Sequence, residues 1–298
     1  MQSLLLLFTC LALGALVTRL ARPPAGLADA LNWWVINVAL PALVLSIVPG
    51  LPFSAGLWFP AVAMWFVFLG GWGLFAAAGR AAGWSGARIG ALTLTCGLGN
   101  SAFIGLPLIE ALRGREALPV AAIADQAGVF LSLAIGGSLV AALYSGGHVS
   151  AAPVARRVLL FPPFIALLAG LALGATGGLP AFLAPLIERI GETLVPLALF
   201  SVGLQLRLRL EPGHAAPVAA GLGWKLALAP LLVWLIGRAA DIEGGVLEVT
   251  VLQAAMAPMI SGAILAQQNR LEPALANAVL GLGILLSFVT VPLVDRLL

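Results

Sequence analysis

Charged residues are scarce in this sequence of 298 residues. They make up 9% of it, whereas soluble domains are about one-quarter charged, and hydrophobic residues make up 61%. So few polar side chains cannot cover a surface that faces water on all sides. The composition therefore excludes a soluble enzyme, a disordered chain and a secreted disulfide scaffold. It predicts an integral membrane protein that lies in a lipid bilayer.

Cysteines and catalytic motifs are also sparse. Cys10 and Cys96 are the only cysteines, and both lie in apolar stretches, which argues against a disulfide or a thiolate metal site. The excess of 15 Lys and Arg over 12 Asp and Glu is too small for a nucleic-acid-binding patch. No Walker loop or His-Glu-x-x-His motif occurs. We therefore expect no catalysis, cofactor, metal or nucleic-acid partner.

Apolar runs of about 20 residues, the length of helix that crosses a bilayer, recur along the whole chain. They are continuously apolar rather than alternating, which favours helices over a barrel. The opening residues lack the basic region of a signal peptide, so the first run is expected to remain in the protein. The sequence predicts an all-α protein with ten spans, at roughly 3–20, 31–49, 58–79, 89–111, 119–144, 158–176, 183–205, 217–236, 246–266 and 274–294.

Arginines in the connections predict the orientation. Nine lie in the connections that follow odd-numbered spans: Arg19, Arg22, Arg80, Arg88, Arg156, Arg157, Arg207, Arg209 and Arg270. Five lie on the other side: Arg113, Arg115, Arg189, Arg238 and Arg296. The positive-inside rule then places both termini outside the cytoplasm. Because arginine greatly outnumbers lysine and Ala and Gly abound, we expect a bacterial source and the cytoplasmic (inner) membrane.

Residues 1–145 and 158–298 resemble each other. Four patterns recur in order about 155 to 160 positions later: Leu11–Ala15 at 171–175, Pro41 and Ser46 at 196 and 201, Gly79–Ala82 at 237–240, and Gly128 and Ser132 at 283 and 287. Each half holds five spans, an odd number, so the second half must be inverted relative to the first. Inverted repeats are typical of secondary transporters, whose binding sites lie near the midplane at broken helices.

Spans 4 and 9 carry residues that interrupt a helix. Span 4 has glycines and Asn100 just before Pro107, and span 9 has Pro258 at the corresponding depth. The N-termini of opened half-helices suit a carboxylate, although proline kinks made for packing would give the same pattern. The predicted substrate site comprises Gly99, Asn100, Ser101, Gly105, Pro107, Gln253, Ala257, Pro258 and Met259.

Ionisable residues at membrane depth are costly and therefore candidates for function. Asp125 in span 5 could carry a coupled proton, pair with Lys225 in span 8, or cap a half-helix. Lys225 could offset the charge of an anionic substrate or extend to the interface. Further candidates for the pathway, which could equally bond between helices, are Asn37, Pro41, Ser201 and Gln205.

Other polar residues are expected to face water. Glu110, Arg113, Arg115 and Glu116 follow span 4 and are interpreted as a solvated loop rather than a gate. His148 and His214 lie in connections and are interpreted as solvated side chains.

Several of these motifs resemble the auxin efflux carrier family. Residues 100–108 resemble its Asn-x4-Gly-x-Pro-Leu signature, and residues 196–203 resemble its seventh helix. Residues 253–258 with Ala266 resemble its ninth helix, but no asparagine precedes the proline here. Asn32 with Pro41 resembles the second helix, and Lys225 with Pro230 the eighth. The resemblance covers essentially the whole chain.

This resemblance implies a fold shared with bile-acid sodium symporters. Ten helices would form two inverted five-helix repeats, with helices 1, 2, 6 and 7 as a scaffold. Helices 3–5 and 8–10 would form a moving core in which helices 4 and 9 are broken and cross. The family moves organic anions, including auxin in plants and malate or malonate in bacteria. Lys225 would occupy the place of a sodium ion in relatives, and the scaffold would form a homodimer.

The sequence therefore predicts a secondary transporter of small organic anions that works by alternating access. One alternative is a ten-helix drug/metabolite transporter, which would have unbroken central helices and cytoplasmic termini. A membrane sensor or channel that does not transport by a carrier mechanism is a second alternative. A channel would show flux without counterflow, and a sensor would bind a ligand without flux.

Overall fold

The structure is a computed structural model, and it describes residues 2–21, 23–51, 56–148, 150–206 and 208–298. The N-terminal half contains α1 (Gln2–Leu20), α2 (Leu27–Trp34), η1 (Val35–Ala39), α3 (Leu40–Ile47), η2 (Val48–Gly50), α4 (Trp58–Ala82), α5 (Gly86–Cys96), η3 (Ser101–Gly105), α6 (Leu106–Arg113), η4 (Arg115–Ala117), α7 (Leu118–Ile123), η5 (Ala124–Phe130), η6 (Ser132–Gly137) and α8 (Ser138–Ser145).

The C-terminal half is helical as well. It contains α9 (Ala151–Leu159), α10 (Pro162–Ala175), α11 (Ala184–Glu192), α12 (Leu194–Gln205), α13 (Ala215–Gly223), η7 (Trp224–Leu228), α14 (Ala229–Ala239), α15 (Gly244–Ala254), α16 (Ile260–Gln268) and α17 (Pro273–Leu297). Within the described residues no strand is formed, and one isolated β-bridge joins Gly99 to Pro258.

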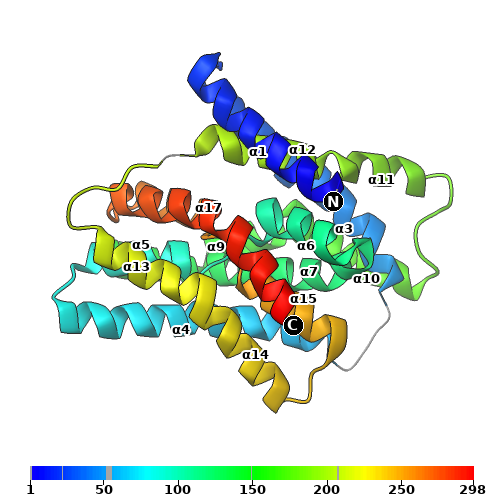
Figure 1. The fold of residues 1–298 in the computed structure, drawn as a ribbon. Helices are drawn as coiled ribbons and strands as arrows, with labels where there is room; N and C mark the ends of the chain where they lie inside the picture. Colours follow the sequence, from blue (N-terminus) through cyan, green and yellow to red (C-terminus); the bar gives the residue numbers. More distant parts are fainter. Residues whose placement is uncertain (1, 22, 52–55, 149, 207) are drawn as a thin grey trace.

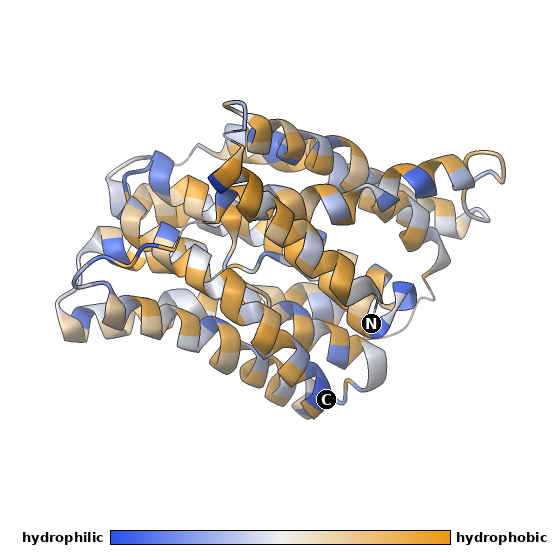
Figure 2. Ribbon diagram, turned by 45° about the horizontal axis from the view of Figure 1, so that its top comes forward, coloured by the Kyte–Doolittle hydropathy of each residue, from blue (hydrophilic) through white to orange (hydrophobic). Residues whose placement is uncertain are grey.

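In the part of the chain that the structure describes, five stretches of helix are long and apolar enough to cross a membrane. They cover Leu27–Gly50, Trp58–Ala82, Arg115–Ser145, Ala215–Ala239 and Pro273–Leu297. The pair α9 and α10, bent by 54°, forms a sixth if it is counted as one span. Figure 2 shows hydrophobic residues along the helices, with hydrophilic ones gathered mostly at helix ends and connections. The prediction of an integral membrane protein is therefore confirmed.

Helix is present in every predicted span, with different boundaries. The second begins at Leu27 rather than at 31, and the seventh is divided into α11 and α12. The sixth bends where Pro162 and Pro163 begin α10, because proline fits the first turn of a helix but not its interior. Arg22 and Arg207, which were used for the orientation, lie outside the described residues.

Three prolines inside the predicted spans are accommodated by widened turns rather than by breaks. Pro41, Pro107 and Pro230 each stand at the second position of an α-helix that follows a five-residue π turn. Proline has no N–H, and its ring crowds the carbonyl four residues earlier, so a wider turn relieves the conflict. The interruption predicted in span 4 is therefore present at residues 97–100, whereas Pro107 itself lies in continuous helix.

Close packing of small residues brings helices from the two halves together. In Figure 1, α1 and α12 lie side by side at one edge of the molecule. There Gly14 leaves no room for a Cβ beside the backbone oxygen of Phe200, and Gly203 leaves none beside that of Leu11. Elsewhere α3 packs against α10 and α11, while α5 packs against α8, α16 and α17. Glycine allows such close approach of helix backbones in membranes.

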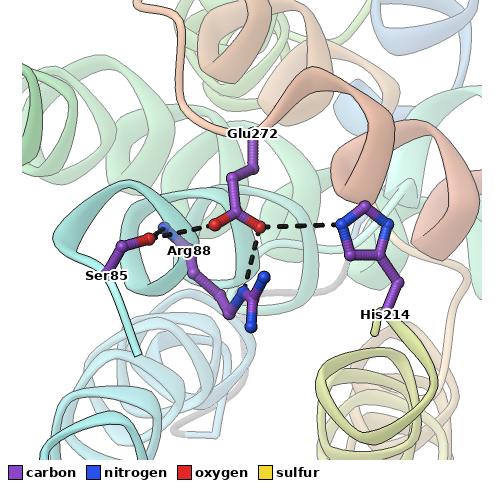
Figure 3. Close-up of polar contacts among 4 residues, drawn as sticks. All are labelled: Ser85, Arg88, His214 and Glu272. Atoms are coloured by element: carbon purple, nitrogen blue, oxygen red, sulfur yellow. Dashed lines mark hydrogen bonds and ion pairs between the residues drawn. The ribbon is translucent and has the colours of Figure 1, made fainter. Parts of the chain in front are cut away.

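Polar side chains tie the helix ends together in two clusters. In Figure 3, Ser85 Oγ and Arg88 Nε donate hydrogen bonds to the Glu272 carboxylate at 2.9 and 3.0 Å. The Nε2 atom of His214 lies 3.9 Å from the same carboxylate. The starts of α5, α13 and α17 therefore meet. His214 is buried, so its interpretation as a solvated side chain is wrong: the carboxylate of a distant segment covers it.

The second cluster lies at the opposite end of α17. Arg113 at the end of α6 pairs with Glu248 of α15 and with Asp295 near the end of α17. Its interpretation as part of a solvated loop is therefore wrong, because two carboxylates from remote helices hold it.

Gly262 provides a test of the packing between α16 and α5. A Cβ at Gly262 would overlap the backbone carbonyl of Leu94, which has no freedom to move aside. We expect Gly262→Ala to lower the free energy of unfolding by about 1–3 kcal/mol. Thermal unfolding in detergent measures this. Gly73→Ala in α4 is the control, since a Cβ there meets nothing within 4 Å. Equal melting temperatures for the two variants would contradict the packing described.

Candidate functional site

The two unwound segments meet in the interior of the protein. One follows α5 at residues 97–100 and the other follows α15 at residues 255–259. The Asn100 N–H donates to the Ala257 carbonyl at 2.8 Å, and the Met259 N–H donates to that of Thr95 at 3.0 Å. We call this place of contact between residues 97–100 and 255–259 the crossing. Pro258 has no N–H and so needs no acceptor there. The interruptions predicted in spans 4 and 9 are thus present and lie against each other.

Two helix N-termini begin at this crossing. One is the helical run 101–113, and the other is α16, which starts at Ile260. No backbone acceptor among the described residues takes the N–H groups of Ser101, Ala102, Ile260 or Ser261. The first N–H groups of a helix carry a partial positive charge and attract anions. Both N-termini therefore offer donors to an anion.

A cavity of about 370 Å³ lies beside the crossing. Five of the predicted residues line it: Asn37, Asn100, Ser101, Asp125 and Met259. Its aromatic walls include Phe130 and Phe161, whose rings are stacked at 3.8 Å between centroids. It reaches the exposed residues Asp29 and Arg157, at the beginning of α2 and near the end of α9. The cavity is thus mainly apolar, with its polar groups concentrated at the crossing and at this outer end.

Asn100, Ser101 and Asp125 are buried polar residues of the cavity wall. Asn100 is 3% exposed, and its side-chain nitrogen has no hydrogen-bond partner among the described residues. Asp125 is 4% exposed and accepts hydrogen bonds from the Ser101 hydroxyl and the Gln126 amide. An unpartnered buried amide is costly unless a ligand pairs with it. Asn100 is therefore ready to donate to a bound molecule.

Lys225 is completely buried on η7 and does not line the cavity. Its Nζ donates to the Ala254 carbonyl at 2.7 Å, at the last residue of α15. A cation is favourable at a helix C-terminus. Two alternatives are therefore wrong: Lys225 does not extend to the interface, and within the described residues it forms no ion pair with Asp125. The carbonyl groups released by the break attract it instead.

Comparisons with known proteins match nearly the whole chain. The family model described as "Membrane transport protein" matches residues 3–294. The chain belongs to this family. The resemblance to the auxin efflux carriers, which are of the same type, is thereby confirmed. The family indicates a membrane transporter and not an enzyme.

Two archaeal relatives are similar to this transporter. An uncharacterized transporter of Methanothermobacter thermautotrophicus is 28% identical over 269 residues, which cover 89% of this chain and 87% of the relative. An uncharacterized transporter of Methanocaldococcus jannaschii is 25% identical over 174 residues, covering 57% of this chain and 55% of that relative.

The other predicted site residues of the transporter lie behind the cavity wall or away from it. Gln253 donates to the Ala121 carbonyl at 3.1 Å, and Gly105 is so close that a Cβ would lie 2.6 Å from Gln253 Oε1. Gly99, Ala257 and Pro258 form the crossing itself, while Pro107 lines a different crevice. These residues shape the site without lining the cavity.

On the opposite wall of the transporter, one of four predicted residues reaches the cavity. Asn37 lines it, whereas Pro41 begins α3. Ser201 donates to Asn32 Oδ1 at 2.6 Å, and the Gln205 amide donates to Ser201. Ser201 therefore bonds between α12 and α2, whereas Gln205 bonds within α12. Asn32 is the member of this network that lines the cavity. Their part in a transport pathway stays a prediction.

Among the cavity residues that were not predicted as parts of the site, three carry a charge or a hydroxyl group. Asp29 and Arg157 were counted as residues of connections, and Ser261 follows the break in span 9. Ser261 corresponds roughly to the position after Asn100 in the other break, so the internal repeat contained a signal for it. Nothing in the sequence indicated that Arg157 would lie beside the cavity, because α9 was expected to be a connection.

Lys225→Met tests the role of the buried ammonium group. The substitution keeps the volume but leaves the Ala254 carbonyl without its donor, so we expect stability to fall by about 1–3 kcal/mol. Thermal unfolding in detergent measures the loss. Lys225→Arg is the comparison, because it retains a donor. Unchanged stability in Lys225→Met would show that the crossing does not depend on this contact.

Proposed function

We propose that this protein is a secondary transporter of small organic anions, carboxylates in particular, and that the anion binds in the cavity beside the crossing. The observation that carries the proposal is the convergence of donors there. Two helix N-termini with free N–H groups and the unpartnered amide of Asn100 border one cavity. Carboxylates are the ligands that such groups favour. In broken-helix transporters, half-helix N-termini hold substrate carboxylates in this way.

The cavity also suits a small molecule in size and lining. Its volume of about 370 Å³ falls in the range of pockets for small ligands, which are largely apolar with a few placed polar groups. The stacked rings of Phe130 and Phe161 offer an apolar surface to the carbon skeleton of the anion. Malate, malonate and an indole-acetate-like monocarboxylate are the candidates to test.

Alternating access requires two bodies that move against each other, and the pattern of polar contacts supports such a division. The scaffold group is α1–α3 with α9–α12, and the core group is α4–α8 with α13–α17. Across the described part of the chain, the hydrogen bonds made by side chains stay within one group or the other. Contacts between the groups are mostly apolar, which leaves few specific bonds to break when one group shifts.

The same division fits ten crossings in two inverted repeats, residues 1–145 and 158–298. The clusters at Glu272 and at Arg113 gather connections that an alternating ten-span path would bring to the same sides. The breaks after α5 and α15 fall in corresponding spans, the fourth and the ninth. They also disfavour the ten-helix drug/metabolite type, which would have unbroken central helices. Both termini lie outside the cytoplasm in this proposal, with the protein in a bacterial inner membrane.

Asp125 is the proposed coupling group. Its carboxylate lines the cavity in which the anion would bind, so two like charges would meet in a medium of low polarity. A proton on Asp125 removes this repulsion. Binding of the anion would therefore favour uptake of a proton by the same site, and the two would cross together. Sodium is the alternative coupling ion.

Counterflow in proteoliposomes tests the function as a whole. We expect labelled malate, malonate or the monocarboxylate to exchange saturably with unlabelled substrate inside the vesicles. Loss of exchange without sodium would make sodium the coupling ion. Flux far above carrier rates without counterflow would favour a channel, and ligand binding without flux would favour a sensor.

Asn100→Ala tests the binding site. Losing one hydrogen bond to a charged group costs about 1.5–3 kcal/mol, so we expect the KM for the exchanged anion to rise about 10- to 100-fold while the protein still inserts and folds. Asn277→Ala is the control, because Asn277 bonds to Gln267 at the exposed surface. Normal uptake by Asn100→Ala would remove this residue from the site.

Asp125→Asn tests the coupling. The amide cannot carry the proton, so we expect uptake driven by a pH gradient to be lost while exchange at equal pH continues. Proteoliposomes with an imposed pH difference measure both rates. Asp241→Asn is the control because Asp241 is an exposed carboxylate outside the cavity. If Asp125→Asn still accumulated substrate against a gradient, Asp125 would not be the coupling group.

A further inference from the structure

We propose that Arg115 forms an ion-pair gate with Glu188 and Glu192, which closes the side of the transporter opposite the cavity. The gate rests on the alternating access proposed above and adds the contact that must break when access changes sides. Arg115 lies on η4 of the core group, and both glutamates lie on α11 of the scaffold group. Its guanidinium nitrogens lie 3.1 Å from Glu188 Oε1 and 3.9 Å from Glu192 Oε1.

These two pairs are distinguished by what they connect. Within the described residues, each of the other ion pairs joins two elements of the core group: Arg88 or His214 with Glu272, Arg113 with Glu248 or Asp295, and Arg238 with Glu243. Among the described residues, the ionic contacts between the core group and the scaffold group are therefore those of Arg115. Its interpretation as a member of a solvated loop overlooked α11, which lies far away in the sequence.

The gate lies at the end of the molecule away from the outer end of the cavity. The helical run from α2 to α3 connects the two places. Asp29 at its beginning lines the cavity, whereas Leu43 near its end packs against Gly191 of α11. Fourteen residues of helix separate these positions, a distance of about 21 Å at 1.5 Å per residue. The cavity and the gate therefore serve opposite faces of the transporter.

A second crevice lies directly beside the gate. It has a volume of about 320 Å³ and is lined by residues of both groups, including Leu7, Leu43 and Val195 from the scaffold and Pro107 from the core, together with Arg115 and Glu192. Separation of Arg115 from α11 would widen this crevice toward the crossing. The ion pairs thus bridge the route that an outward-open state needs.

The strength of these pairs suits a contact that opens in every cycle. The three side chains are 36% to 57% exposed, and exposed ion pairs shift an equilibrium by about fivefold at most. The Arg113 pairs are less exposed, at 18% to 30%, and join three helices of one group. Arg113 therefore stays paired as the core group moves, while the pairs of Arg115 break.

Cysteine labelling on the two faces tests the gate without any substrate. Val195→Cys reports the crevice and Ile264→Cys reports the cavity. A membrane-impermeant maleimide is added to vesicles of each orientation. We expect Arg115→Gln to raise the labelling rate at Val195→Cys about threefold to fivefold and to lower it at Ile264→Cys. The double variant Glu188→Gln, Glu192→Gln should do the same, and exchanging the charges through Arg115→Glu with Glu188→Arg should reverse the change.

Arg238→Gln is the matched control, since its pair with Glu243 lies within the core group. The buried residues Cys10 and Cys96 report folding, because a misfolded variant exposes them to the same reagent. Unchanged labelling in both the Arg115 and the double glutamate variants overturns the gate, as does an equal change in Arg238→Gln. Altered labelling with no counterflow of any carboxylate leaves the gate standing and removes the proposed substrate class.

Discussion

Backbone hydrogen bonding at the crossing is the constraint on which the rest of the structure depends. Unwound backbone in a membrane must find partners within the protein, because lipid supplies none. Here the unwound segments bond to each other through Asn100 and Ala257, and Met259 bonds to Thr95 at the end of α5. Neither break could exist alone at this depth. The packing of α5 against α16, with Gly262 pressed on the Leu94 carbonyl, follows from holding the two segments in register.

The crossing also sorts the charges of the site. Each break produces one helix C-terminus and one helix N-terminus. The C-terminus of α15 receives the ammonium group of Lys225, which is enclosed by protein. The N-termini at Ser101 and Ile260 border the cavity. The ammonium group is thus enclosed at a helix C-terminus, whereas the positively polarised helix N-termini border the cavity and could contact a ligand.

Sequence reasoning was able to locate the crossing because its signals are local. Pro258 and the glycines around Asn100 cannot continue a helix, so both breaks could be predicted. Depth in the membrane also singled out Asp125 and Lys225, which are buried beside the crossing. The two inverted repeats, the substrate class and the roles of the site residues remain predictions.

Partners of long side chains could not be predicted in the same way. A hydrophobicity pattern gives the depth of a residue but not the helix that it faces. Lys225 was free to reach Asp125 or a carbonyl group, and the freed carbonyl of Ala254 was not visible in the sequence. The partners of Arg113, Arg115 and His214 could not be predicted either, because their carboxylate partners come from segments distant along the chain.

The apolar surface between the scaffold and core groups has a consequence for direction. Sliding one apolar face along another exchanges contacts of the same kind, so neither end position gains a large enthalpy from the move. A protein built in this way stores little preference for inward or outward delivery. Under the proposed alternating access, net flow would follow the concentrations of the proposed anion and coupling ion on the two sides, and the same molecule would serve import or export as conditions change.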